Sequence, residues 1–140
     1  MPRTIQSDQK NILVVEDDGL VLKLVELILE HGGFNVLPAR SAKEAMLTEA
    51  GFQGTIHLLI SDVMMPEMQG PDLVKAMKKR RPEMRVMLMS GYADGSLLIL
   101  NYGWHFIKKP FVAMTLLSKV REVLNGASRD QGTDYFDTRQ

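Results

Sequence analysis

The strongest structural signal in the sequence is the stretch Ile12-Leu13-Val14-Val15-Glu16-Asp17-Asp18, in which an apolar run leads directly into three acids. The run is rich in β-branched residues, which favour a buried strand. An amphipathic helical pattern follows at residues 19–31, and the alternation of apolar runs with helical stretches continues along the chain. This order predicts an α/β fold in which a parallel sheet carries helices on both faces.

The other predicted elements follow from the same signals. We expect strands at residues 34–39, 56–61, 84–89 and 103–107, and helices at residues 41–50, from residue 71 onward, and at residues 111–124. Pro38 lies within the second strand, and because proline cannot donate to a ladder it indicates an edge strand. An outermost second strand fits a doubly wound five-stranded sheet in the order 2-1-3-4-5.

The composition narrows the class of protein. The 140 residues suffice for one domain, which we place at residues 10–126, between an N-terminal extension at 1–9 and a mobile tail at 127–140. The 17 basic and 17 acidic side chains balance, which argues against a nucleic-acid partner. The absence of cysteine excludes disulfides, thiolate zinc sites and cysteine nucleophiles. Neither a signal peptide nor a membrane span is recognisable, so we expect a cytoplasmic protein without a membrane partner.

Three carboxylates follow central strands of the predicted sheet. Glu16 and Asp17 come directly after the first strand, and Asp62 follows the third strand, which lies beside the first. Loops at the carboxyl ends of parallel strands converge on one crevice. Like charges repel one another there unless a cation lies among them, and oxygen ligands of this kind suit Mg²⁺.

Ser90 and Lys109 follow the fourth and fifth strands at the same edge of the sheet. A hydroxyl and an ammonium group that face a metal–carboxylate site provide what a phosphoryl group needs. Formal charges agree with this interpretation, since the three carboxylates, one divalent ion and Lys109 add to zero. Conversion of Asp62 to an acyl phosphate adds about one negative charge, which would draw Ser90 and Lys109 inward.

In four segments the sequence resembles the response-regulator receiver domain of two-component signalling. The segments are Ile12-Leu13-Val14-Val15-Glu16-Asp17-Asp18, Asp62-Val63-Met64-Met65-Pro66-Glu67-Met68-Gln69-Gly70, Ser90-Gly91-Tyr92-Ala93 and Lys109-Pro110-Phe111. They span about residues 10–125 and together are highly specific. The resemblance implies a flavodoxin-like fold and a phosphoacceptor on Asp62 that takes its phosphate from a histidine kinase or a histidine phosphotransfer protein. It implies a switch in a phosphorelay and not a conventional enzyme.

The same resemblance implies a metal role for four residues. Asp17, Asp62 and the backbone carbonyl of Met64 would bind Mg²⁺, and Glu16 would help through water.

The resemblance also implies how the phosphoryl group is read. Lys109 would contact it, and a cis Lys109–Pro110 peptide bond would place the lysine in the cleft. Ser90 and Phe106 would form the switch pair.

Some features depart from the family pattern. Between Ser90 and Lys109 lie 18 residues, about one helical turn fewer than the family spacing. We therefore expect a shortened fourth helix around residues 95–101, and a homodimer through that face stays open. Met64 and Tyr92 are bulky, and they predict restricted attack by water and a long-lived phosphoryl group.

The helix at residues 19–31 has an unusually wide apolar face. At 100° per residue, the positions predicted to face the core are Val21, Leu24, Val25 and Ile28. Leu22 and Leu29 flank this face, and we expect them to form part of the kinase-docking surface.

Three alternatives stay open beside a single receiver domain. The chain could be a receiver module of a hybrid sensor histidine kinase or of a longer regulator, or it could be a receiver-like interaction scaffold that works without phosphate. An aspartyl-phosphate phosphatase would use a similar nucleophile, but Met64 stands where such enzymes carry a second acid two residues after the nucleophile.

Overall fold

The computed structural model of the protein describes residues 9–91 and 104–126. Its elements are β1 (Asn11–Val15), α1 (Gly19–His31), β2 (Asn35–Ala39), α2 (Ala42–Gly51), β3 (Leu58–Asp62), α3 (Gly70–Arg80), β4 (Arg85–Ser90), β5 (His105–Lys108) and α5 (Ala113–Leu124). The predicted alternation of strands and helices is therefore confirmed. The expected short helix at residues 95–101, Tyr92, the tail at 127–140 and most of the extension at 1–9 lie outside the described residues.

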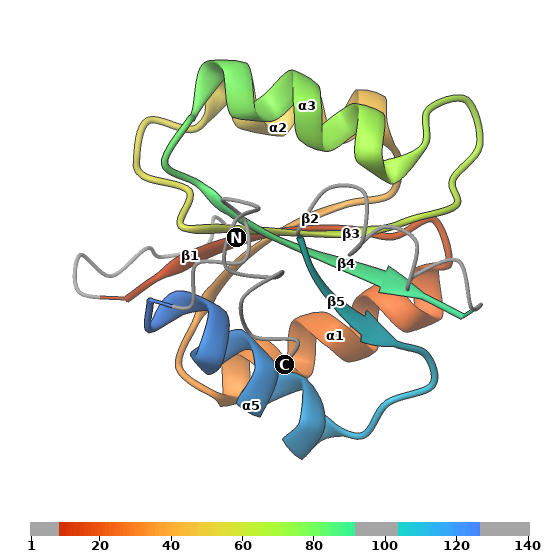
Figure 1. Ribbon diagram of the computed structural model, residues 1–140, viewed down its shortest axis with the longest axis vertical. Helices are drawn as coiled ribbons and strands as arrows, with labels where there is room; N and C mark the ends of the chain where they lie inside the picture. Colours follow the sequence, from red (N-terminus) through yellow and green to blue (C-terminus); the bar gives the residue numbers. More distant parts are fainter. Residues whose placement is uncertain (1–8, 92–103, 127–140) are drawn as a thin grey trace, which may run out of the picture.

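The strands form one parallel sheet in the order β2-β1-β3-β4-β5, as predicted. Pro38 lies in the edge strand β2, where its missing N–H costs no ladder hydrogen bond. In Figure 1 the sheet lies between two helical layers, with α2 and α3 on one face and α1 and α5 on the other. β1 and β3 are neighbours, and Val15 pairs with Ser61. This register sets the residues that follow β1 beside the end of β3.

Each face of the sheet has its own apolar core. Alternate residues of β1 divide between the two cores, with Leu13 and Val15 in the core under α2 and α3 and with Ile12 and Val14 in the core under α1 and α5. All four side chains are fully buried. Burial on both faces explains why the central strands are continuous apolar runs.

Polar caps fix the starts of two helices at the carboxyl edge of the sheet. Asp18 Oδ1 accepts hydrogen bonds from the backbone N–H groups of Leu20 (3.0 Å) and Val21 (3.3 Å), so it is the N-cap of α1. Ser41 Oγ accepts from the N–H of Glu44 (3.0 Å) at the start of α2. The two caps hold the loops that follow β1 and β2.

The predicted orientation of α1 is wrong in part. Leu22 and Leu29 are buried, at 6% and 0% exposure, whereas Leu24 is 52% exposed. The buried residues of α1 are Leu22, Val25, Glu26 and Leu29, which follow the helical spacing of one stripe. Because apolar residues occur all around this helix, the sequence does not favour one orientation, and contact with the sheet selects it. Leu22 and Leu29 therefore belong to the core and cannot form a docking surface.

The described part of the chain shows no element suited to a bilayer. Among residues 9–91 and 104–126, none of the helices combines the length and apolar character that a membrane-spanning segment requires.

Candidate functional site

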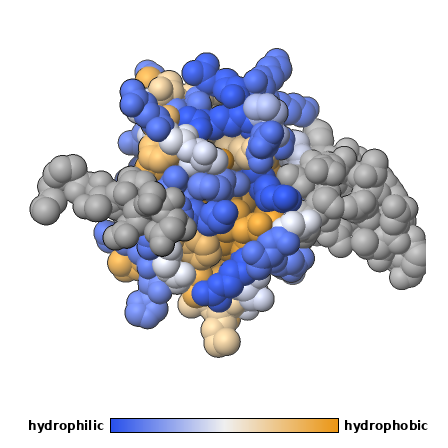
Figure 2. All heavy atoms as spheres, turned by 90° about the vertical axis from the view of Figure 1, so that its left-hand side faces the viewer, coloured by the Kyte–Doolittle hydropathy of each residue, from blue (hydrophilic) through white to orange (hydrophobic). Residues whose placement is uncertain are grey.

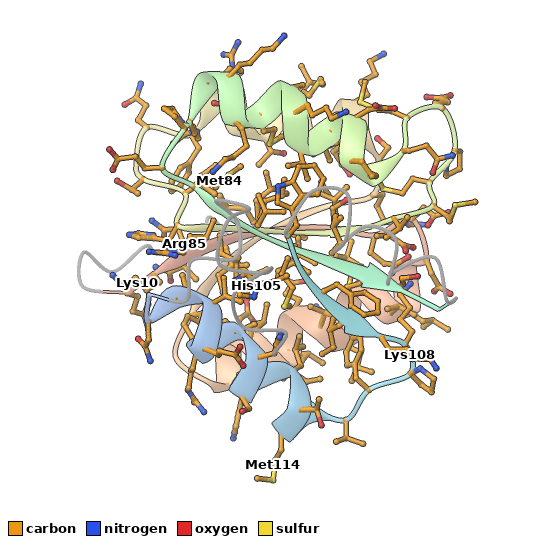
Figure 3. All side chains as sticks on the ribbon, viewed as in Figure 1. Lys10, Met84, Arg85, His105, Lys108 and Met114 are labelled. Atoms are coloured by element: carbon orange, nitrogen blue, oxygen red, sulfur yellow. The ribbon has the colours of Figure 1, made fainter. Side chains whose placement is uncertain are left out.

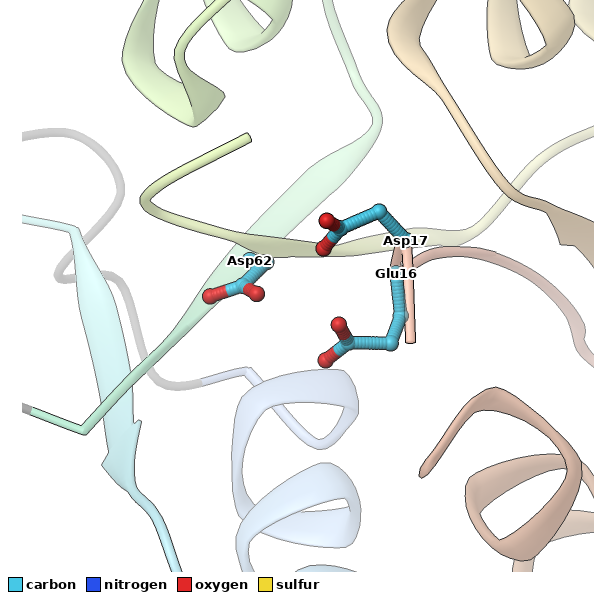
Figure 4. A group of neighbouring side chains, drawn as sticks. All are labelled: Glu16, Asp17 and Asp62. Atoms are coloured by element: carbon cyan, nitrogen blue, oxygen red, sulfur yellow. The ribbon is translucent and has the colours of Figure 1, made fainter. Parts of the chain in front are cut away.

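The carboxyl edge of the sheet gathers three acidic side chains. Glu16 and Asp17 follow β1, and Asp62 is the last residue of β3. One carboxylate oxygen from each of the three lies within 4.8 Å of the others (Figure 4). Glu16 and Asp62 are buried, at 1% and 8% exposure. The sequence predicted this convergence, because the ends of neighbouring parallel strands meet at one edge.

Lys109 extends from the end of β5 into this acidic cluster. Its Nζ donates to Glu16 Oε1 at 2.7 Å and to Asp62 Oδ2 at 3.1 Å. Its backbone N–H donates to the carbonyl of Ser90 (2.8 Å), which ties it to β4. The Lys109–Pro110 peptide bond is cis. One ammonium group thus bridges two carboxylates that come from different strands.

Burial and charge change the protonation behaviour of this pair. Burial raises the pKa of the Glu16 carboxyl, the negative charge of Asp62 adds to the increase, and the ammonium of Lys109 and the Asp18 N–H oppose it. Burial lowers the pKa of the Lys109 ammonium, but its bonds to Glu16 and Asp62 outweigh burial, so the pKa is raised overall. The lysine therefore stays charged, and the site holds more negative than positive charge.

The donor set fits a hard divalent cation. The three acids offer only oxygen ligands, and magnesium prefers a few carboxylate oxygens together with water. Lys109 neutralises one of three negative charges, so a divalent ion would bring the formal charge of the cluster to zero.

The other residues that the sequence predicted for the site lie on β4 and β5 or just after β3. Ser90 is the buried last residue of β4 and pairs with Lys108 of β5. Phe106 is half-buried within β5 and pairs with Leu88, two residues before Ser90. The side chain of Met64, two residues after β3, is 52% exposed.

Gly70 is a residue of the site to which the sequence analysis gave no role. A Cβ at this position would lie 2.3 Å from the carbonyl oxygen of Asp62 and 3.2 Å from Val63 Cα. The Gly70 N–H donates to the carbonyl of Val63 (2.8 Å), which folds the start of α3 back over the end of β3. Glycine is needed because the backbone of Asp62 occupies the space of a side chain.

A cavity of about 470 Å³ lies at the opposite, amino-terminal edge of the sheet. Lys10 and Arg85 line it, and Figure 3 shows them side by side. Figure 2 views this face, where hydrophilic side chains alternate with apolar ones. The guanidinium of Arg81, a further lining residue, is held by Glu49 and by the carbonyls of Gly54 and Phe52. This cavity is separate from the acidic cluster.

Comparisons of sequence give one family. A family model described as "Response regulator receiver domain" matches residues 12–121. The sensor kinase CckA of Brucella abortus (strain 2308) is 32% identical over 121 residues, which cover 84% of this chain and 13% of that kinase. The transcriptional regulatory protein CpxR of Escherichia coli (strain K12) is 33% identical over 115 residues, which cover 81% of this chain and 48% of that regulator. The chain thus spans less than half the length of either relative.

Solved structures agree. A CheY-like response regulator receiver domain protein from Methanospirillum hungatei JF-1 has a TM-score of 0.75 at 31% identity, and the match covers 89% of this chain and 98% of that one. The receiver domain of the hybrid histidine kinase CckA has a TM-score of 0.70 at 36% identity, covering 81% and 98%. Because the family model covers well over half of the sequence and the folds coincide, the chain belongs to the family of response regulator receiver domains.

Proposed function

We propose that the protein is a Mg²⁺-dependent phosphoacceptor whose phosphorylated residue is Asp62. The observation that carries this proposal is the bridge from Lys109 Nζ to Glu16 and Asp62 within a cluster of three acids. A structural role alone would not favour two buried carboxylates and a third acid around a single ammonium, because buried like charges destabilise a fold. A site that holds a cation and, together with it, a phosphoryl group would explain the arrangement.

The transfer needs one bond to form and one to break. A carboxylate oxygen of Asp62 attacks the phosphorus of a phosphohistidine in a partner protein, and the P–N bond breaks as the P–O bond forms. The P–N electron pair stays on the ring nitrogen. When the other ring nitrogen of the donor carries a proton, the imidazole departs neutral. Water later attacks the phosphorus of the acyl phosphate, the bond from phosphorus to the Asp62 oxygen breaks, and inorganic phosphate and the free carboxylate are released.

Each group of the chain has a proposed part in this reaction. Asp17, Asp62 and the Met64 carbonyl would hold Mg²⁺, with Glu16 acting through water. The ion would neutralise charge on the phosphoryl oxygens. Lys109 would move its hydrogen bonds from the carboxylates to a phosphoryl oxygen.

The switch would use the strand beside Asp62. Ser90 would donate its hydroxyl to the phosphoryl group, and Phe106 would change its burial in response. Because Asp62 would accept one phosphoryl group and its acyl phosphate would be hydrolysed slowly, the chain would act as a switch and not as a conventional enzyme. Exposed Met64 beside the site would limit attack by water, and Met64→Asn is expected to accelerate dephosphorylation.

Exposed apolar side chains around the acidic cluster support a helical histidine kinase or phosphotransfer domain as the partner. Leu20, Leu24 and Leu27 of α1 are 85%, 52% and 52% exposed, and we call them the α1 leucines. Met114, at the start of α5, is 80% exposed (Figure 3). Both helices begin just after residues of the site, so a partner that covers these side chains would bring its histidine to Asp62. We propose residues 10–126 as the functional domain and the cytoplasm as its location.

The central experiment is phosphorylation by a small-molecule donor. We expect the chain incubated with acetyl phosphate and Mg²⁺ to gain the mass of one phosphoryl group, and we expect no gain in EDTA or in Asp62→Asn. The matched control is Glu83→Gln, which removes an exposed carboxylate that lines the cavity at the opposite edge of the sheet. A phosphate-independent scaffold would gain no mass, and a phosphatase would turn over donor without retaining phosphate.

The partner surface requires a separate test. Leu24→Glu is expected to slow transfer from a cognate phosphohistidine protein by at least about 10-fold, as for a central interface residue, while leaving acetyl phosphate reactivity unchanged. Leu47→Glu is the control, because Leu47 is 66% exposed but lies on α2, at the other face of the sheet. Equal loss with both donors would contradict the docking role.

A further inference from the structure

Arg40 reaches from the end of β2 into the loop that carries the acidic residues. Its Nε and Nη2 donate to the backbone carbonyl of Asp17 at 3.3 and 3.1 Å. In the described part of the chain, these are the hydrogen bonds that Asp17 receives. Two guanidinium nitrogens of an exposed arginine, at the end of the neighbouring strand, thus bind the backbone carbonyl of a candidate metal ligand.

The backbone of Arg40 is itself fixed. The N–H of Glu16 donates to the carbonyl of Ala39 (3.1 Å), which joins the ends of β1 and β2. The N–H of Arg40 donates to the carboxylate of Glu44. Glu44 in turn donates its own N–H to Ser41 Oγ (3.0 Å) at the start of α2. The guanidinium therefore extends from a backbone segment that hydrogen bonds hold in place.

Gly19 leaves the space in which this guanidinium lies. A Cβ on Gly19 would be 3.2 Å from both Cζ and Nη1 of Arg40. That separation is below normal van der Waals contact between heavy atoms. The glycine at the first position of α1 and the arginine after β2 consequently fit together across the loop.

The three consecutive acids of this loop are anchored in different ways. Glu16 is bonded through Lys109 Nζ and accepts from the Asp18 N–H at 3.0 Å. Asp18 caps α1. Asp17 is anchored through its carbonyl by Arg40. We propose that Arg40 is a positioning residue that orients the Asp17 peptide so that its carboxylate faces the metal site, an inference that rests on the proposed function.

The sign of the effect separates positioning from simple charge. Arg40 is positive and lies near the cation site, so its charge alone opposes Mg²⁺, and its removal would tighten binding. If Arg40 instead orients Asp17, its removal weakens binding. Loss of a group that orients a metal ligand typically lowers metal affinity 10- to 100-fold. Because Arg40 is exposed, we expect Arg40→Ala to weaken Mg²⁺ binding by about 10-fold, the lower end of that range.

The test is calorimetric titration of the full chain with MgCl₂, after urea unfolding has shown that each variant is folded. Arg40→Lys keeps the charge that opposes Mg²⁺ and loses the two-nitrogen contact with the Asp17 carbonyl, so it should bind Mg²⁺ at least as weakly as Arg40→Ala does. Gly19→Ala keeps Arg40 but displaces the tip of its flexible side chain, so it should also weaken binding. Arg40→Ala should add little further loss in the Gly19→Ala background. Arg121→Ala removes an exposed charge of α5 and is the control for net charge.

A measurement without metal completes the test. Because Arg40 binds the carbonyl of the Asp17–Asp18 peptide group, the ¹⁵N resonance of Asp18 should shift in metal-free Arg40→Ala and stay unchanged in Arg121→Ala. Tighter or equal Mg²⁺ binding by Arg40→Ala, or an unmoved Asp18 resonance, would overturn the role of Arg40 and leave the phosphoacceptor proposal standing. Absence of Mg²⁺ uptake by the unaltered protein would instead overturn the proposed function.

Discussion

Lys109→Met removes the ammonium that bridges Glu16 and Asp62 and keeps a side chain of similar length. In the metal-free protein the cluster then holds three carboxylates without a cation, two of them buried. Removal of one partner from a buried ion pair costs about 3–5 kcal/mol. The Lys109 side chain is 24% exposed, so we expect the lower end, about 3 kcal/mol. With a urea m-value of about 2 kcal/mol/M, the unfolding midpoint should fall by about 1.5 M in EDTA.

Magnesium should reverse much of this loss. The variant cluster carries one more negative charge than the unaltered cluster, so it should bind Mg²⁺ more tightly and be stabilised more by it, since ligand binding to the folded state adds to stability. Phosphorylation should nevertheless slow by about 100-fold, because the phosphoryl oxygens lose a charged donor. Mg²⁺ should therefore restore much of the stability of Lys109→Met without restoring its rate of phosphorylation.

The assay is urea unfolding followed by circular dichroism, in EDTA and in MgCl₂, with acetyl phosphate reactivity measured by intact mass. Lys108→Met is the matched control, because Lys108 is adjacent in sequence but exposed (Figure 3). An unchanged midpoint in EDTA, or Mg²⁺ stabilisation no larger than in the unaltered protein, would refute the electrostatic account of the site.

Other regions give further predictions. Gly70→Ala should lower stability by about 2 kcal/mol and slow phosphorylation, since its Cβ would lie 2.3 Å from the Asp62 carbonyl; Gly51→Ala, with open space around its Cβ, should do neither. Glu49→Gln should cost about 2 kcal/mol in urea unfolding, because buried Glu49 accepts from two arginine side chains at 2.7 and 2.9 Å. Burial and the charge of Lys10 lower the pKa of His57 from its ordinary 6.5. The unfolded chain therefore binds this proton more readily, and stability should fall as the pH decreases below about 6.5; His57→Gln should show a smaller fall.

The order of the sheet was predictable because local signals agree with the global fold. The alternation of apolar runs and helical stretches predicts parallel pairing, and Pro38 predicts the edge. The register in which Val15 pairs with Ser61 is seen only in the structure, because β1 and β3 are buried on both faces and have no alternation that would specify it. The acids that end these strands had to meet at one edge, so most of the acidic cluster was predictable from the residues alone.

The orientation of α1 was not predictable in the same way. The helix has apolar residues around most of its circumference, and hydrophobicity cannot rank nearly equal faces. Packing against the sheet and α5 buries Leu22 and Leu29 and exposes Leu24. The candidate docking surface therefore consists of the α1 leucines and not of Leu22 and Leu29, which are buried. Only tertiary contacts contain that information.

The contacts of Arg40 and Gly70 were hidden for a different reason. Each depends on a backbone atom of a residue distant in sequence, the Asp17 carbonyl for Arg40 and the Asp62 carbonyl for Gly70. Neither an arginine that follows a strand nor a glycine at the first position of a helix indicates such a contact in a single sequence. The charges of the site follow from residue type, whereas the orientation of its side chains depends on the geometry of the loops that carry them.

The charges of the site and the contacts that fix its loops together explain why the three acids stay close to one another despite their repulsion. Repulsion among Glu16, Asp17 and Asp62 would be relieved most simply if the loops moved apart. Strand pairing prevents this on the side of Asp62, where Val63 N–H also donates to the carbonyl of Met89 (2.9 Å). The cap on α1 and the grip on the Asp17 carbonyl prevent it on the other side. With movement blocked, a cation bound beside Lys109 would relieve the repulsion that remains. Under the proposed function, the free energy spent in holding the acids together would then become affinity for Mg²⁺ and, through it, for a phosphoryl group.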